Sequence, residues 1–286
     1  MDIGLIKTAY RELLGHSDFV REAEPELIMD NIPAVEAYTE GGKDSGTLSG
    51  TYLYHLSKTC SLLSPNDRVL DLGCGSGILL SMIAQLNPQC QFLGVDLSLP
   101  MLEKAKKIAN DKGIFNISFR EEDICQLSTI KDNSIDVLCS SMALHHLPDL
   151  HHLNETFKQI SRVLKPGGFL YINDFGKLKK EKSIDYFVSR SGLEQNSILA
   201  KDYYYSLKAA FSIEEFKKVV SDNLSSDFKV FSTPISPVSV VITNGKKKKN
   251  NSLDNSISKM YQRLPKDRKS DFNQLKLFLR ISGLNF

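Results

Sequence analysis

The sequence predicts an α/β fold in which a doubly wound sheet of seven strands, mostly parallel with an antiparallel edge strand, carries helices on both faces. Three observations lead to this prediction. Short runs of β-branched and aliphatic residues alternate with segments of helical periodicity. The connections are long enough for right-handed crossovers between parallel strands. Two further strand-like runs follow closely enough in the chain to pair as a hairpin.

Each predicted strand is short, apolar and bounded by turn-forming residues. The five parallel strands are expected at residues 68–72, 91–95, 116–120, 135–139 and 168–173, and the antiparallel hairpin at 228–232 and 238–243. Helices are expected before and between them, at residues 51–63, 78–86, 100–110 and 151–164. Ser212 and Glu215 have capping-box spacing, which predicts the start of one more helix.

Three regions are expected along the chain. Residues 1–50 form an N-terminal helical segment and candidate lid, with helical character over 1–37 interrupted at Pro25 and Pro33. Residues 51–244 form the central α/β domain, with a cap insertion at about 176–210. Residues 245–286 form a basic linker and a C-terminal helical tail. Because the insertion is rich in tyrosine and phenylalanine, it could cover the carboxyl edge of the sheet, although packing of an extra helix pair accounts for its aromatics equally well.

Composition excludes several classes of protein. Hydrophobic residues make up 41% and charged residues 24%, which is typical of a globular domain. No apolar run is long enough to span a bilayer, and the start of the chain lacks the pattern of a secretory signal. The five cysteines are dispersed without a C-x-x-C pair, which favours free thiols in a reducing compartment. We therefore expect a cytoplasmic protein without a membrane span.

Charge is distributed unevenly along the chain. Residues 245–286 carry 11 Lys and Arg against 3 Asp and Glu, so the total of +2 leaves −6 on the first 244 residues. A mildly acidic body is a poor surface for phosphate groups, which makes nucleic acid an unfavoured partner of the catalytic part. The lysine run within the tail is most simply a solvated linker.

The stretch VLDLGCGSG, residues 69–77, places Gly73, Gly75 and Gly77 directly after a predicted strand and before a helix. Glycine admits positive φ and lets a ligand lie against the main chain, and the carboxyl ends of parallel strands are the usual ligand site of an open α/β sheet. The dinucleotide fingerprint needs its third glycine one residue later, where Ile78 stands. Binding of a dinucleotide is therefore disfavoured.

Four further motifs follow in register: GVDLS (94–98), REEDI (120–124), SIDVLCSSMALHHLPD (134–149) and RVLKPGGFLYI (162–172). Together with VLDLGCGSG they resemble the class I S-adenosylmethionine (SAM) dependent methyltransferases, strongly over residues 64–175 and more weakly to about 243. The resemblance implies a Rossmann-like fold, SAM as cofactor and S-adenosylhomocysteine (SAH) as product. Residues 51–244 are then the methyltransferase domain.

The resemblance also implies roles for individual residues. Asp71 and the three glycines would hold the methionine end of the cofactor, and Asp96, followed by Leu97, would bind both ribose hydroxyls. A carboxylate suits two vicinal hydroxyls because it has two acceptor oxygens. Asp123 would accept from the adenine amino group, with Ile124 beside the ring, and the fourth-strand motif adds Ser140. Alternatives from the residues alone are that Asp71 only anchors the loop, that Asp96 caps a helix, and that Asp123 is a surface acid.

Two histidines are candidates for catalysis. His145 and His146 follow the fourth predicted strand at the same sheet edge as the glycines, and an imidazole near neutrality can deprotonate an acceptor. Packing or hydrogen bonding is the competing interpretation of both. With His151 and His152 they form a four-histidine sequence group, but its spacing does not suit one helix face, so we expect no metal.

The sequence therefore predicts a methyltransferase that moves a methyl group from SAM to an O, N, C or S atom of a small-molecule acceptor by in-line displacement. One alternative is a methyltransferase acting on protein or RNA recruited by the basic tail. Another is a SAM- or nucleotide-binding protein without transfer activity. Association as a homodimer is compatible with the sequence. The acceptor itself is not encoded in any motif.

Overall fold

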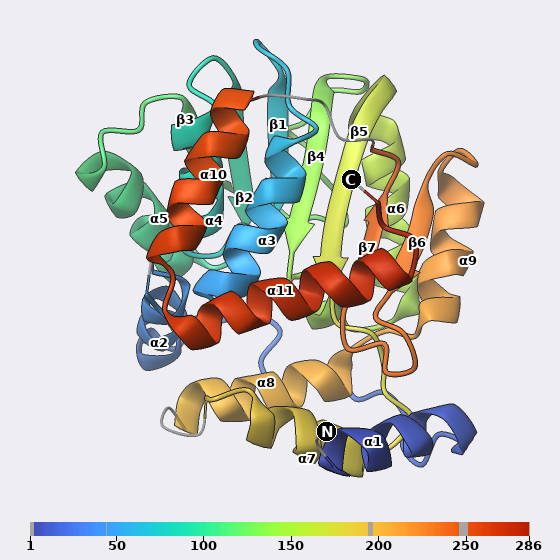
Figure 1. Cartoon of the computed structure of the whole chain (residues 1–286). Coiled ribbons are helices and arrows are strands. Elements are labelled where there is room, and N and C mark those ends of the chain that lie inside the picture. Colours follow the sequence, from blue (N-terminus) through green and yellow to red (C-terminus); the bar gives the residue numbers. More distant parts are fainter. Residues whose placement is uncertain (1–2, 44, 194–196, 246–250, 286) are drawn as a thin grey trace.

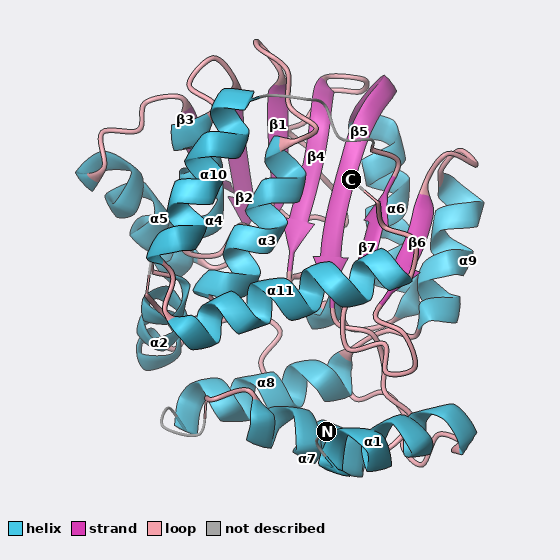
Figure 2. Ribbon diagram, in the orientation of Figure 1, coloured by secondary structure: helices cyan, strands magenta, loops and turns pink. Residues whose placement is uncertain are grey.

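The computed structural model describes residues 3–43, 45–193, 197–245 and 251–285, and a seven-stranded sheet forms its centre (Figures 1 and 2). The strand order is β3-β2-β1-β4-β5-β7-β6. Strands β1 to β5 run parallel, β7 is antiparallel to β5, and β6 is antiparallel to β7. Their bounds are β1 Arg68–Leu72, β2 Gln91–Asp96, β3 Ile117–Glu121, β4 Ile135–Ser141, β5 Leu164–Asp174, β6 Lys229–Ser232 and β7 Val240–Thr243. The predicted α/β fold and its antiparallel edge are confirmed.

Helices cover both faces of the sheet because its strands are apolar on both sides. One core contains Val69 of β1 and residues of α3 Ser49–Cys60, α4 Ile78–Leu86, α10 Asn251–Arg263 and α11 Lys266–Ile281. The other contains Leu70 and Leu72 with residues of α6 Leu150–Val163 and α9 Ile213–Asn223. Successive side chains of β1 thus enter opposite cores, as strand geometry requires.

Helices near the carboxyl edge begin at polar caps. Ser98 precedes α5, Leu99–Asp111, and accepts from the backbone N–H of Met101 at 3.2 Å. Asp149 precedes α6 and accepts from the backbone N–H of His152 at 3.0 Å. These bonds satisfy donors that the first helical turn leaves unpaired. The predicted capping box is confirmed at the start of α9.

The N-terminal region is helical only in part. Helices α1, Ile3–Leu14, and α2, Ile32–Gly42, are separated by an irregular segment that we call the strap, residues 15–31. The helical character expected over residues 1–37 is wrong for the strap. Its backbone bonds instead to distant segments, for example from Asp18 N–H to the carbonyl of Lys179 at 2.9 Å.

The inserted segment forms α7, Glu181–Arg190, and α8, Ser197–Ala209, which we call the cap. Helices α1, α7 and α8 lie together beyond the carboxyl ends of β4 and β5 (Figure 1). A small apolar cluster of Leu178, Ile184 and Leu207 joins the cap to Phe19 of the strap. Strap and cap are therefore packed as one cover over the sheet edge.

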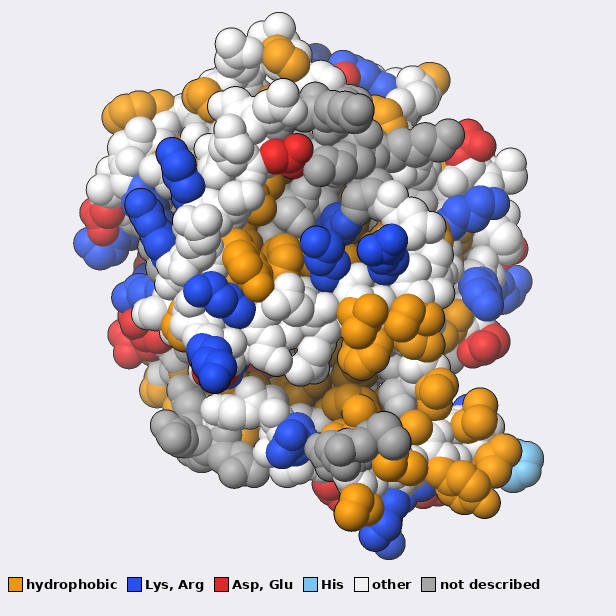
Figure 3. All heavy atoms as spheres, viewed as in Figure 1, with side chains coloured by type: hydrophobic (Ala, Val, Ile, Leu, Met, Phe, Trp, Pro, Cys, Tyr) orange, Lys and Arg blue, Asp and Glu red, His pale blue; other side chains and the backbone are white. Residues whose placement is uncertain are grey.

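Helix α1 exposes apolar side chains on its outer face. Ile3, Tyr10, Leu13 and Leu14 are between 61% and 68% exposed, and hydrophobic side chains gather over α1 in Figure 3. Such a patch is typical of a surface that contacts another molecule. Association as a homodimer stays a prediction. Among the described residues, none of the helices combines the length and apolar character needed to cross a bilayer.

Candidate active site

The glycines after β1 have three different surroundings, although all three have positive φ. A Cβ on Gly73 would lie 2.4 Å from the Cβ of Ala143, so this position permits close packing of two loops. A Cβ on Gly77 would lie 2.8 Å from a side chain of α5, so this position seats α4 against its neighbours. A Cβ on Gly75 would meet nothing nearer than 4.0 Å. Gly73 and Gly75 both line the cavity, but of the three glycines only Gly75 has open space in the direction of a side chain.

Asp96 ends β2 beside this open backbone. One of its carboxylate oxygens accepts from Gly75 N–H at 2.8 Å and the other accepts from Ser98 N–H at 2.9 Å. Burial raises the pKa of Asp96 even though these backbone donors act in the opposite direction. Each oxygen can accept more than one hydrogen bond, so both remain able to receive a hydroxyl from the cavity. The carboxylate is therefore suited to the two ribose hydroxyls of SAM.

Asp123 and Ile124 also line the cavity, as does Leu97, which is 42% exposed. The carboxylate of Asp123 accepts from Cys125 N–H and from the Gln126 side-chain amide, each at 2.8 Å. These two bonds hold the loop after β3 against the cavity. An apolar side chain next to a fixed acceptor suits an adenine ring and its amino group.

Three residues expected at the cofactor do not line the cavity: Asp71, Gly77 and Ser140. The Ser140 hydroxyl donates to the carbonyl of Leu72 at 2.8 Å, which ties β4 to β1. Asp71 is buried, and its carboxylate accepts from the Cys139 thiol at 3.6 Å. Burial raises the pKa of Asp71 to about 7. Direct contact of these three residues with SAM stays a prediction, while their observed contacts hold the strand tips.

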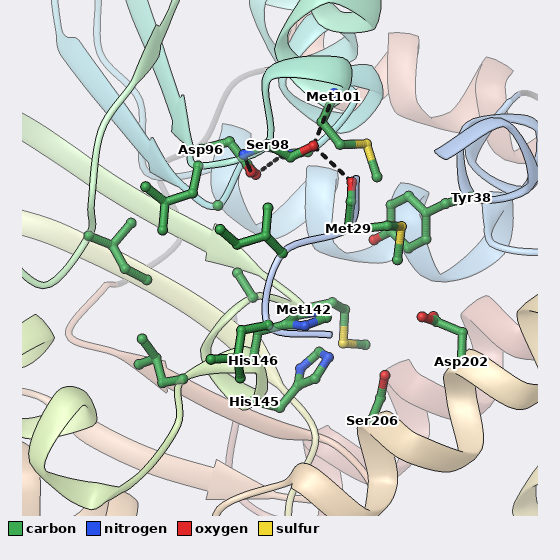
Figure 4. Close-up of a pocket in the computed structure, with 18 of the residues that line it drawn as sticks. Met29, Tyr38, Asp96, Ser98, Met101, Met142, His145, His146, Asp202 and Ser206 are labelled. Carbon is green, nitrogen blue, oxygen red and sulfur yellow. Dashed lines mark hydrogen bonds between the residues drawn. The ribbon is translucent and has the colours of Figure 1, made fainter. Parts of the chain in front are cut away.

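The cavity has a volume of about 330 Å³ and two distinct ends (Figure 4). Asp96, Ser98 and Met101 lie at one end, which we call the cofactor end. The other, which we call the acceptor end, is formed by the loop after β4, η1 Leu144–His146, the residue after β5, and α8. It includes Met142, His145, His146, Phe175, Asp202, Tyr203 and Ser206. Tyr38 of α2 and Tyr52 of α3 also line the cavity, and the role of residues 1–50 as a lid stays a prediction.

His145 is buried at the acceptor end and has carboxylates on both sides of its ring. Its Nδ1 lies 2.6 Å from Asp174 and its Nε2 lies 3.8 Å from Glu24. Burial alone would lower the pKa of His145, but the two carboxylates outweigh burial and raise it. Asp174 also accepts from the backbone N–H groups of Leu144 and Phe175, and its pKa is lowered although burial opposes this. The hydrogen bond to Asp174 thus fixes the orientation of the His145 ring, and the carboxylates increase its basicity.

His146 has a different environment. Burial, together with the neighbouring His145, lowers the pKa of His146 to about 3. Its Nδ1 is buried without a hydrogen-bond partner in the described structure. The two rings lie 4.4 Å apart between centroids. Of the two predicted catalytic histidines, only His145 therefore has the arrangement of a general base, while neutral His146 can pack or hydrogen-bond.

The strap contributes two charged residues that sequence reasoning missed, Arg21 and Glu24. The Arg21 guanidinium donates to the carbonyls of Ala209 and Pro148, each at 2.7 Å, and of His145 at 3.1 Å. Glu24 is buried and accepts from the Ser206 hydroxyl at 2.8 Å. No local pattern signals these contacts because their partners lie more than 120 residues away.

The ligand atoms of Glu24, His145 and His146 lie within 4.8 Å of one another, close enough to hold a metal ion. The Asp174 and Glu24 carboxylates beside both ring nitrogens of His145 equally suit a proton relay. His152, of the four-histidine sequence group, lies by Asp149 at 2.7 Å instead. We interpret the group as a relay, and the expected absence of a metal stays a prediction.

Residues 63–228, more than half of the chain, match the family model described as a methyltransferase domain. The chain belongs to this class I SAM-dependent methyltransferase family. Over 156 residues the methyltransferase is 30% identical to the 27-O-demethylrifamycin SV methyltransferase of Amycolatopsis mediterranei, covering 54% of this chain and 52% of that protein. Over 123 residues it is 32% identical to the tRNA (carboxymethyluridine(34)-5-O)-methyltransferase of Arabidopsis thaliana, covering 41% of this chain and 26% of that protein.

The chain thus spans about half or less of the length of these curated relatives. Among solved structures, the plantazolicin methyltransferase in complex with SAH aligns with a TM-score of 0.58 and 16% identity over 92% of both chains. At this identity the likeness shows the fold alone. The enzyme's methyl donor is SAM, and the open Gly75 backbone and Asp96 provide surroundings that suit it.

Proposed function

We propose that this enzyme transfers a methyl group from SAM to an O, N, C or S atom of a small-molecule acceptor. The observation that carries the proposal is the single cavity shared by the cofactor end and the acceptor end. Side chains of the strap and the cap, such as Met29 and Asp202, form part of its walls, so an acceptor that reaches His145 lies between the sheet edge and these segments. Such a cavity favours a small molecule over a side chain of a folded protein. The relative named for 27-O-demethylrifamycin SV supports the same class of acceptor.

The mechanism assigns separate tasks to the two ends. SAM supplies an electrophilic methyl group on a sulfonium, which is transferred to a nucleophile in line with the sulfur. Asp96 and the Gly75 backbone hold the cofactor, and the strap and cap exclude water from the reacting atoms. Orientation of this kind supplies much of the rate acceleration in a displacement reaction.

His145 is proposed as the general base for an acceptor that carries a proton. A bond forms between the acceptor atom and the methyl carbon, the carbon–sulfur bond breaks with its electron pair going to sulfur, and the acceptor's proton passes to Nε2 of His145. The Nδ1–H of His145 donates to Asp174, which leaves Nε2 as the basic nitrogen. Glu24 then lies beside the imidazolium and stabilises its charge.

A second candidate function is methylation of RNA, because one relative is named as a tRNA methyltransferase. Two observations weigh against it. None of the described residues of the basic tail lines the cavity. On the face that carries α10 and α11, Lys and Arg side chains are dispersed among uncharged groups rather than gathered in one stripe (Figure 3).

Transfer of a labelled methyl group tests the proposal. The enzyme is incubated with methyl-labelled SAM and, separately, with the low-molecular-weight, protein and RNA fractions of an extract from its source cells. We expect label in the low-molecular-weight fraction and none above background when His145→Asn replaces the wild type. Transfer of label to the RNA or protein fraction instead would contradict a small-molecule acceptor.

A further inference from the structure

The acceptor end of the cavity contains a carboxylate that the proposed transfer does not use. Asp202 lies on α8, one turn before Ser206, and both side chains point into the cavity opposite His145 and His146 (Figure 4). Ser206 is occupied by its bond to Glu24. Asp202 is partly buried, and burial raises its pKa although His145 acts in the opposite direction. Its ionised form would gain from a cation placed in the cavity.

Carboxylates outnumber basic groups in the cavity lining. Its lining includes the acids Asp96, Glu122, Asp123 and Asp202, and among the described residues it includes no lysine or arginine. Arg21 approaches the acceptor end from behind, but its guanidinium donates to backbone carbonyls and lies 3.8 Å from the centre of the Phe211 ring. At the acceptor end the imidazolium of His145 already lies between Asp174 and Glu24, so an acceptor with a carboxylate or phosphate would meet Asp202 without a free matching cation.

Two aromatic residues line the cavity together with Asp202. Phe175 and Tyr203 have ring centroids 5.4 Å apart, and both residues line the cavity. The faces of aromatic rings attract ammonium groups, and a nearby carboxylate adds a charge-assisted hydrogen bond. Leu147, Leu193 and Leu199 add apolar side chains to the cavity lining.

We infer that the acceptor carries a protonated amine on an apolar body, with the ammonium bound by Asp202 against Phe175 and Tyr203. The inference rests on the proposed small-molecule function and specifies the class of acceptor. Asp202 is a specificity-determining residue in this view, because it distinguishes amines from alcohols and acids of the same shape. The ammonium anchors the acceptor and leaves its methyl-accepting atom open.

Binding of matched ligands tests the inference without turnover. Phenethylamine, phenethyl alcohol and phenylacetate have similar shapes and differ in charge, and a set of aliphatic amines with their matched alcohols and acids extends the series. Each compound is titrated into the enzyme with and without saturating SAH, and its affinity is measured by saturation-transfer NMR. We expect at least one amine to bind about tenfold more tightly than its alcohol, and the acids to bind most weakly.

Two variants sharpen the test. Asp202→Asn keeps the shape of the side chain and should remove the preference for amines while changing alcohol binding by less than about twofold. Asp185→Asn, an exposed acid on neighbouring α7, is the matched control and should leave the preference intact. The inference is overturned if no amine binds more tightly than its alcohol, or if Asp202→Asn weakens all ligands equally. Calorimetry with SAH alone separates these results from a failure of the proposed function, which would appear as absent SAH binding.

Discussion

The two ends of the cavity are built in different ways. Residues of the cofactor end come from successive strand tips, so Gly75, Asp96 and Asp123 lie within 50 positions of one another. The acceptor end joins η1, the residue after β5 and the cap, and the bond from Ser206 of the cap to Glu24 of the strap spans 182 positions. The first arrangement follows from the topology of a parallel sheet, whereas the second depends on the packing of distant segments. Substitutions should therefore affect binding of SAM at one end and turnover at the other.

The largest expected effect is on turnover. His145→Asn should lower kcat by about 10²- to 10⁴-fold, since it removes a general base. The dissociation constant for SAM should change by less than about twofold because Asp96 and Gly75 are untouched. Single-turnover kinetics with a labelled acceptor measure the first quantity and calorimetry the second.

His151→Asn, on the exposed side of α6, is the control for this variant and should retain full activity. The raised pKa of His145 adds a pH test: the base must be neutral, so kcat should rise with pH through a value above 6.5. A wild-type kcat in His145→Asn would remove the base from the mechanism.

The next effect is on cofactor affinity. Asp96→Ala should weaken SAM binding by about 3 kcal/mol or more, because two charge-assisted hydrogen bonds to the ribose are lost. Glu121→Ala, at the exposed end of neighbouring β3, should bind SAM normally. Calorimetry compares the two variants, and equal affinities would separate Asp96 from the cofactor end.

Two glycine substitutions compare a position with open space beside it and a position that is tightly packed. Gly75→Ala adds a methyl group to open space at positive φ, so it should cost about 1–2 kcal/mol of stability and reduce SAM affinity severalfold. Gly73→Ala carries the same backbone strain and also forces a Cβ to 2.4 Å from Ala143, so it should destabilise the fold considerably more. Urea unfolding and SAM titration of both variants check the order. Equal losses of stability would contradict the distinction.

A further effect is a pH dependence of stability that comes from Asp71 in β1. Burial raises the pKa of Asp71 to about 7, compared with about 4 when unfolded. Between these values the folded state holds a proton that the unfolded state releases, so this group lowers the free energy of unfolding as pH rises from about 4 to 7, by about 1 kcal/mol per pH unit. Asp71→Asn should remove that slope, as urea unfolding across this range can show. An unchanged slope would exclude a buried, proton-binding Asp71.

The sequence predicted most of the fold because alternation and turn residues are local signals. The parallel strands, the edge hairpin and the capping box at Ser212 required no knowledge of tertiary contacts. Residues 15–31 were predicted as mostly helical, whereas in the structure their backbone and Arg21 bond to distant carbonyls. Helix propensity is a local quantity and does not account for competing hydrogen bonds to distant segments.

The sequence predicted the site residues that lie at strand ends and missed those that distant segments contribute. Asp96, Asp123 and the histidines lie at strand tips, where position follows from topology. The different roles of Gly75 and Gly77 depend on the side chains packed around each, and a pattern of glycines in the sequence does not contain that information. Glu24 and Asp202 lie outside the sheet, so its topology does not predict their positions. Their electrostatic interactions with His145 are visible only in the structure.

A crystal structure of the enzyme with SAH tests the central claim, that one cavity holds the methyl donor at one end and the acceptor at the other. We predict both ribose hydroxyls on the Asp96 carboxylate, the homocysteine chain along the Gly75 backbone, and the sulfur directed toward the space between His145 and Asp202. SAH bound outside this cavity, or inside it with the sulfur directed away from the acceptor end, would contradict the account.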